Sequence, residues 1–253
     1  MPARKNIYSD IYSFGYSKIK LFSKNDISKF KKKIISNLNS KNFIKKRFNN
    51  KNLNNYHKIV QNELIHKKFT DPKNRTLKFN QKIIQKIKNN MEIKNLVKKT
   101  WQNNSYDIKL YSKNSVRNNF AAYRLARPFE KFKDDVGGAH IDLHFNNKIH
   151  KNHKILYTFW VPVIGNDKKS TLRFAPLSHK KNHSVRYLLK QNKYVSKIFK
   201  ESYVKKFKFE RINIKIGEVL ILHPNLLHGG SKNLGKKTRI SFDFRIFNKK
   251  YIN

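Results

Sequence analysis

Hydrophobic positions in the first hundred residues recur at the spacing of one face of an α-helix. Asp26 opens a segment whose apolar residues follow at helical spacing, namely Ile27, Phe30, Ile34, Ile35 and Leu38. A longer amphipathic stretch covers residues 83–97. Residues 41–58 are the most polar part of the chain, which predicts a loop or a poorly ordered segment. We therefore expect residues 1–104 to form a helical region.

After about residue 105 the period of the pattern changes from that of a helix to that of a strand. The candidate strands are 106–112, 119–126, 139–145, 154–163, 171–174, 211–215, 218–223 and 237–247. A helical insert is expected near 184–200. Helices followed by short strands favour a mainly β fold, a cupin-like jelly roll with the N-terminal helices layered on one sheet. Residues 105–253 would form its β core, in one integrated domain with the helices.

Three residues of the β region have the chemistry of a metal site. His140 and Asp142 are two apart in a predicted strand, so their side chains leave the same face and can share one ion. His228 follows another predicted strand, at a turn before two glycines. Two histidines and a carboxylate form the facial triad of non-haem Fe(II) oxygenases. The chain has no cysteine, which excludes thiolate sites and disulfides.

Two alternatives stand beside this interpretation. His140 and Asp142 by themselves are also compatible with a structural ion pair on a strand. His144, two residues beyond Asp142, is a competing ligand, although a position lining the pocket fits it better.

The segment 238–246 alternates strictly between polar and apolar side chains. The polar face, which we expect to line a site, holds Arg239, Ser241, Asp243 and Arg245. The apolar face should pack against the helical layer. Arg239 follows His228 by eleven residues, and its planar guanidinium suits bidentate capture of a carboxylate, with the Ser241 hydroxyl beside it.

In this order, His-x-Asp, a distal His and an Arg eleven residues later resemble the phytanoyl-CoA dioxygenase-like group of Fe(II)/2-oxoglutarate oxygenases. Supporting motifs lie at 123–128, 158–162 and 171–180. The last resembles the family's Pro-Gly-Ser-His segment, with Leu177 in place of Gly. The resemblance covers roughly residues 105–248.

The resemblance implies a double-stranded β-helix that holds Fe(II) through His140, Asp142 and His228. It implies 2-oxoglutarate as cosubstrate, with its distal carboxylate on Arg239 and Ser241, and O2 as oxidant. Trp160 lies on a strand that borders the cosubstrate pocket in such folds. The expected activity is hydroxylation of a small metabolite, because halogenating relatives lack the carboxylate that Asp142 supplies.

The formal net charge of +43 raises a second class of function, nucleic-acid binding. Of the 58 basic residues 47 are lysine, and they are spread evenly along the chain, whereas a binding footprint is usually clustered. We therefore attribute the charge to biased genome composition, with nonspecific nucleic-acid affinity as its consequence, although it also favours an anionic substrate. Two alternatives are an oxygenase acting on a nucleic acid or protein partner, and a basic jelly-roll protein that binds polyanions without turnover.

No stretch of the chain approaches the roughly 18–20 apolar residues of a membrane span. The basic N-terminus is not followed by the apolar region of a signal peptide. We expect a cytoplasmic protein with no membrane partner.

Overall fold

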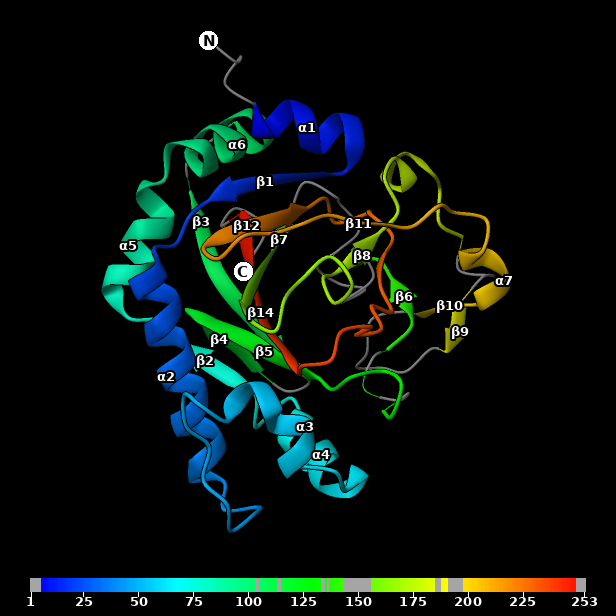
Figure 1. The fold of residues 1–253 in the computed structure, drawn as a ribbon. Coiled ribbons are helices and arrows are strands. Elements are labelled where there is room, and N and C mark those ends of the chain that lie inside the picture. Colours follow the sequence, from blue (N-terminus) through cyan, green and yellow to red (C-terminus); the bar gives the residue numbers. More distant parts are fainter. Residues whose placement is uncertain are drawn as a thin grey trace.

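Two antiparallel sheets face each other, and most helices cover the outer side of the larger sheet (Figure 1). The computed structural model describes residues 6–102, 105–112, 115–132, 135, 137–142, 156–184, 188–190 and 198–248. This arrangement confirms the predicted jelly roll with a helical layer.

The longer helices begin at a polar side chain that accepts a hydrogen bond from their first turn, whereas the two four-residue helices lack such a cap. The α-helices are α1 (Ile7–Phe14), α2 (Lys24–Ser40), α3 (Tyr56–Ile59), α4 (Glu63–Thr70), α5 (Gln81–Asn89), α6 (Met91–Trp101) and α7 (Glu201–Val204), with 3-10 turns at Leu53–Asn55 and Ser178–Lys180. Ser23 and Asp26 form a reciprocal capping box at the start of α2. The predicted segment 83–97 is two helices, because the Asn90 side chain accepts from Ile93 N and starts α6.

Residues 41–58 are more structured than the sequence predicted. They include the 3-10 turn and the start of α3, and they bury Phe48, Leu53 and Tyr56. Phe48 stacks on Tyr56 with ring centroids 5.4 Å apart. A few aromatic anchors in a polar stretch therefore suffice to order it. Within the described ranges, none of the helices has the length and hydropathy to cross a bilayer.

The larger sheet is built around a long central strand. Its strands are β1 (Tyr16–Lys20), β2 (Thr76–Lys78), β3 (Tyr106–Ser112), β4 (Ser115–Asn118), β5 (Phe120–Ala126), β7 (Leu156–Ile164), β12 (Glu218–Leu222) and β14 (Arg239–Asn248). β14 pairs with β7 along one side and with β5 and β3 along the other. β1 and β2, which the sequence did not predict, join N-terminal segments to this sheet through β12 and β5. The division at residue 104 stays a prediction.

The smaller sheet consists of short strands in the order β11-β8-β13-β6-β10-β9. Their bounds are β6 (Ala139–His140), β8 (Arg173–Phe174), β9 (Leu188–Lys190), β10 (Ile198–Phe199), β11 (Glu210–Arg211) and β13 (His228–Gly229). The predicted strand 139–145 ends at His140 in the described part of the chain, and residues 143–145 lie outside it. The predicted helical insert at 184–200 is wrong where it is described, because β9 and β10 lie there.

β14 contacts the helical layer with one face and the interior of the jelly roll with the other. Its apolar side chains pack against the helical layer and the segment after β2. Between ring centroids, Phe242 lies 4.7 Å from Phe30 of α2, and Phe244 lies 5.4 Å from Phe79, which follows β2. Its polar side chains alternate with them and therefore face the space between the sheets. All ten residues of the strand are buried, so the polar face lines an interior site, as predicted.

Candidate metal centre

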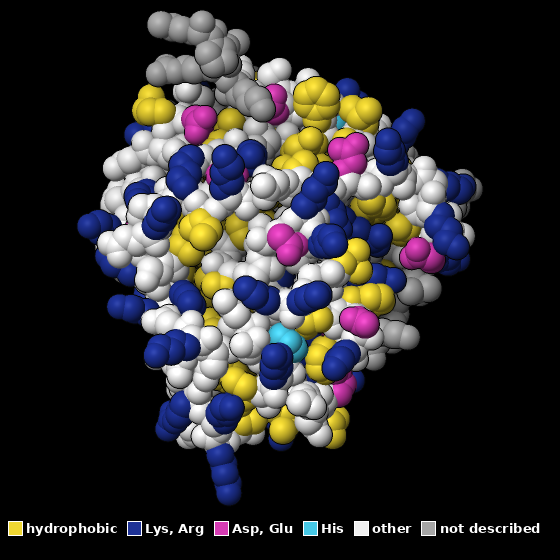
Figure 2. All heavy atoms as spheres, viewed as in Figure 1, with side chains coloured by type: hydrophobic (Ala, Val, Ile, Leu, Met, Phe, Trp, Pro, Cys, Tyr) yellow, Lys and Arg dark blue, Asp and Glu magenta, His cyan; other side chains and the backbone are white. Residues whose placement is uncertain are grey.

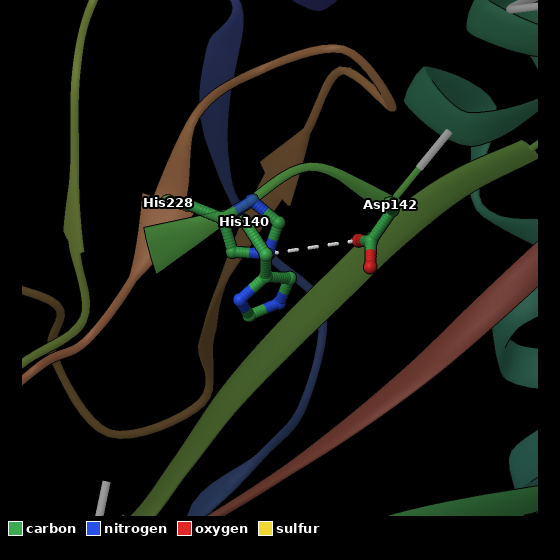
Figure 3. A group of neighbouring side chains, drawn as sticks. All are labelled: His140, Asp142 and His228. Carbon is green, nitrogen blue, oxygen red and sulfur yellow. Dashed lines mark ion pairs between the residues drawn. The ribbon is translucent and has the colours of Figure 1, made fainter. Parts of the chain in front are cut away.

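His140 and His228 face each other across neighbouring strands of the smaller sheet. β6 and β13 pair antiparallel with these two residues directly in register. Their ring centroids are 4.5 Å apart, and Figure 3 shows both imidazoles in the same space. Strand pairing therefore places two histidines that are 88 positions apart in the chain at the separation of a cross-strand pair.

Asp142 completes the group from just beyond the end of β6. Its Oδ2 is 3.7 Å from Nε2 of His228, and Figure 3 shows the carboxylate pointing towards that ring. One ligand atom from each of the three residues lies within 4.8 Å of the others. The structure thus brings together the three predicted ligands. The predicted reason was wrong, because Asp142 does not lie on the strand with His140 but follows it.

Backbone hydrogen bonds hold both histidines in the tautomer that leaves Nε2 able to bind a metal. Nδ1 of His140 lies 3.1 Å from the carbonyl oxygen of Gly138, and Nδ1 of His228 lies 2.9 Å from that of Leu226. A carbonyl can only accept, so each Nδ1 carries the proton and each Nε2 keeps its lone pair. Burial, and next the neighbouring His228, lower the pKa of His140 to about 4, which keeps it neutral at physiological pH.

Asp142 is held from the opposite sheet. Thr158 on β7 donates to Oδ2 at 2.5 Å, and Nη2 of Arg245 on β14 donates to Oδ1 at 2.9 Å. Burial alone would raise the pKa of Asp142, but Arg245, followed by His228 and His140, lowers it well below its usual range. The carboxylate is therefore ionised and fixed in orientation. With the two imidazoles it forms a donor set that suits a divalent transition metal.

Sequence reasoning did not single out Thr158. Its one signal was a position two residues before Trp160, which puts both side chains on the same face of a strand. Arg245, on the polar face of β14, lies 3.7 Å from Asp243, but its shorter contact is with Asp142.

Arg239 and Ser241 lie on the polar face of β14, as predicted. Nη1 of Arg239 donates to the carbonyl oxygens of Ser170 at 2.5 Å and Ser231 at 3.1 Å. Nε of Arg239, Oγ of Ser241 and Oγ1 of Thr171 are buried without a hydrogen-bond partner in the described structure. Burial, and then Arg211, lower the pKa of Arg239 to about 10, so it remains a cation at neutral pH. Unsatisfied buried donors are costly, and a carboxylate ligand would satisfy them.

Trp160 lies on the inner face of the larger sheet, opposite Asp243 of β14. It is buried in an apolar cluster with Leu172, Phe174 and Leu220. These contacts are those of a core side chain, and its place beside a cosubstrate stays a prediction.

Arg124 and His179, which lie in the motifs at 123–128 and 171–180, have structural partners, and the competing ligand His144 lies outside the described residues. Arg124 pairs with Asp243 at 2.8 Å. His179 contacts the carbonyl oxygen of Tyr12 at 2.9 Å through Nε2, which is a structural contact.

Comparison with known proteins agrees with this geometry. A sequence model of the phytanoyl-CoA dioxygenase (PhyH) family matches residues 27–241. No curated protein matches the chain.

Among solved structures, EctD from S. alaskensis with bound Fe has a TM-score of 0.57 at 12% identity, over 96% of this chain and 76% of that one. The non-haem α-ketoglutarate-dependent carbocyclase SnoK from nogalamycin biosynthesis has a TM-score of 0.55 at 10% identity, over 98% and 85%. The epimerase SnoN, in complex with Fe3+, α-ketoglutarate and nogalamycin RO, has a TM-score of 0.54 at 10% identity, over 96% and 82%.

At these identities the solved structures establish the shared fold, which is the double-stranded β-helix. The family match covers most of the chain, and three potential metal ligands meet between its two sheets. The chain therefore belongs to the phytanoyl-CoA dioxygenase (PhyH) family of Fe(II)/2-oxoglutarate-dependent oxygenases.

Proposed function

We propose that this protein is an Fe(II)/2-oxoglutarate-dependent dioxygenase that hydroxylates a small anionic metabolite, with His140, Asp142 and His228 as its iron ligands. One observation carries the proposal. Two histidines, each donating from Nδ1 to a backbone carbonyl, lie beside an ionised carboxylate. One ligand atom from each of the three residues lies within 4.8 Å of the others. A structural ion pair would not require both imidazoles to be held in the same tautomer.

Bound Fe(II) would supply the site at which O2, the oxidant, is activated, so that one oxygen atom enters a substrate C–H bond and the other enters succinate as 2-oxoglutarate loses CO2. The protein's part is to hold the ligands. Strand pairing aligns the two histidines, while Thr158 and Arg245 fix the plane of Asp142. Three protein ligands leave coordination positions open for cosubstrate and oxygen. Asp142 occupies the position that halogenating relatives leave to chloride, which favours hydroxylation.

We assign the distal carboxylate of 2-oxoglutarate to Arg239 and Ser241. Arg239 keeps its charge in a buried position, and its Nε and the Ser241 hydroxyl lack partners in the described structure. Its other contacts, to the carbonyls of Ser170 and Ser231, hold the guanidinium in place. Trp160 would border this position from β7.

An anaerobic titration of the metal-free protein with Fe(II) and 2-oxoglutarate tests the proposal. We expect the weak visible charge-transfer band of a chelated keto acid, and its loss in His228→Ala. Arg239→Met is the matched control, since it should keep Fe(II) binding and require more 2-oxoglutarate to develop the band. Thermal unfolding of each variant shows whether it is folded.

The alternative is a basic jelly-roll protein that binds polyanions without turnover. An inactive relative would be expected to lose at least one ligand, and this chain keeps all three. If folded protein produces neither the charge-transfer band nor succinate, the proposal of an Fe(II)/2-oxoglutarate dioxygenase is wrong, and a polyanion-binding protein becomes the better interpretation. Hydroxylation itself is tested by transfer of one ¹⁸O atom from ¹⁸O2 to an accepted substrate.

A further inference from the structure

A pocket of about 420 Å³ lies beside β8, β11 and the segment that follows β13. Its lining includes four cations and two apolar side chains, Lys168, Arg173, Arg211, Lys232, Phe209 and Leu234. None of the described residues that line it is a carboxylate. Phe174 packs inward on the apolar cluster of Trp160, so its neighbour Arg173 faces the outer side of the smaller sheet. The pocket therefore lies on the outer side of the smaller sheet, although Arg211 is close enough to the interior to lower the pKa of Arg239.

Two arginines lie side by side in this pocket. Arg173 and Arg211 are directly opposite each other on β8 and β11. Like charges in such a pair destabilise a sheet. Burial, and next Arg173, lower the pKa of Arg211, and burial lowers that of Arg173. Neither arginine forms an ion pair with a carboxylate among the described residues, and only the more distant charges of Glu201 on Arg173 and of Asp167 on Arg211 oppose the repulsion.

Both guanidinium groups are nevertheless held in place. Nε of Arg173 donates to the carbonyl oxygen of Gly229 at 3.0 Å, and the guanidinium lies over Phe209 at 4.5 Å from the ring centroid. Arg211 donates to the carbonyl oxygens of Thr171 at 2.5 Å and Lys232 at 2.7 Å. Backbone carbonyls orient the arginines but supply no negative charge of their own. This arrangement is suited to an incoming anion.

The number of cations indicates the kind of anion. Two planar guanidinium groups bind the oxygens of a phosphate bidentately, and the exposed Lys168 and Lys232 add two point charges. A single carboxylate would neutralise one of these four charges. The volume lies within the range of small-molecule sites, and Phe209 and Leu234 offer apolar contact to the rest of a ligand. We propose that this pocket binds a di- or triphosphoryl anion through Arg173 and Arg211.

The overall charge of the protein makes nonspecific binding the main competing explanation. Figure 2 shows Lys and Arg side chains over the whole visible face. A variant of the pocket must therefore be compared with a variant that removes the same charge elsewhere. Lys67 on α4 and Lys98 on α6 are exposed and do not line the pocket, so Lys67→Gln/Lys98→Gln is that control.

Isothermal titration of the full chain with inorganic pyrophosphate, at 150 mM salt and without metal, tests the proposal. We expect one saturable site, weakened roughly tenfold or more in Arg173→Gln/Arg211→Gln and unchanged in the lysine control. Lys168→Gln/Lys232→Gln, which alters exposed side chains, should weaken it several-fold and covers the case in which the arginine variant does not fold. Inorganic phosphate should bind more weakly than pyrophosphate.

Equal weakening in the pocket and control variants, or no saturable binding, would overturn the proposal in favour of diffuse attraction to a basic protein. The titration contains neither Fe(II) nor 2-oxoglutarate. Its outcome is therefore independent of the proposed enzyme activity, and either proposal can fail without the other.

Discussion

Removing the charge of Arg245 tests how the metal centre is built. The side chains of Arg245 and Asp142 are 5% and 0% exposed, and their closest atoms are 2.9 Å apart. Arg245→Met keeps the length and apolar character of the side chain but leaves Asp142 buried without its cationic partner. Thr158 still donates to Oδ2, so the carboxylate keeps one of its two described hydrogen bonds.

Breaking a buried ion pair by removing one partner costs about 3–5 kcal/mol. In a chain of this size each kcal/mol lowers Tm by roughly 2–4 °C, so the metal-free variant should melt about 6–20 °C below the unmodified protein. A divalent cation bound by His140, Asp142 and His228 would supply the missing positive charge. The rise in Tm on adding metal should therefore be larger in Arg245→Met than in the unmodified protein.

Thermal unfolding followed by circular dichroism, with EDTA and then with Mn(II) as a redox-stable substitute for Fe(II), measures both effects. Arg124→Met is the matched control, because the pair of Arg124 with Asp243 leaves 43% of the Arg124 side chain exposed. Such a pair contributes about 1 kcal/mol or less. If Arg245→Met lowers Tm by the same number of degrees with and without metal, the view that Asp142 is a metal ligand is refuted.

Three further predictions follow from individual contacts. Thr158→Val removes one of the donors to Asp142 and should weaken Fe(II) binding about 10–100-fold with little change in fold, as measured by anaerobic titration. Arg239→Met should raise the KM for 2-oxoglutarate while leaving metal affinity unchanged, and an unchanged KM would move the cosubstrate site elsewhere. Burial lowers the pKa of His66 to about 4, so the unfolded chain takes up a proton that folded His66 does not, and stability should fall as pH drops from about 6.5 to 4. In urea unfolding, His66→Gln should reduce this decline, and an unaltered pH dependence would contradict the cause given.

Local pattern was enough to predict a mainly β fold with N-terminal helices and the two faces of β14. The alternation of 238–246 placed Arg239 and Ser241 on one face and Phe242 on the other, and the structure has them there. Side-chain alternation is a property of any extended strand, so it does not depend on what the strand packs against.

Other elements form through contacts with distant parts of the chain, which a local sequence pattern does not reveal. β1 and β2 form because partner strands supply their hydrogen bonds, and short strands such as β13 have too few residues for a period to be seen. The segment 184–200 was expected to be helical, and its described parts form strands at the edge of the smaller sheet. Pairing with distant strands overrides weak local preference.

For the site, the sequence by itself determined which residue types were present and in what order, so His140, Asp142 and His228 could be chosen as ligands. The tertiary structure decided how they meet. His140 and His228 come together because β6 pairs with β13, whereas Asp142 is held by Thr158 and Arg245 from the opposite sheet. The pairing of Arg173 with Arg211 could not be predicted from the sequence either, because only the fold brings β8 and β11 side by side. Contacts between residues far apart in the chain are set by the packing of the whole fold, and a single sequence records the residues but not those distances.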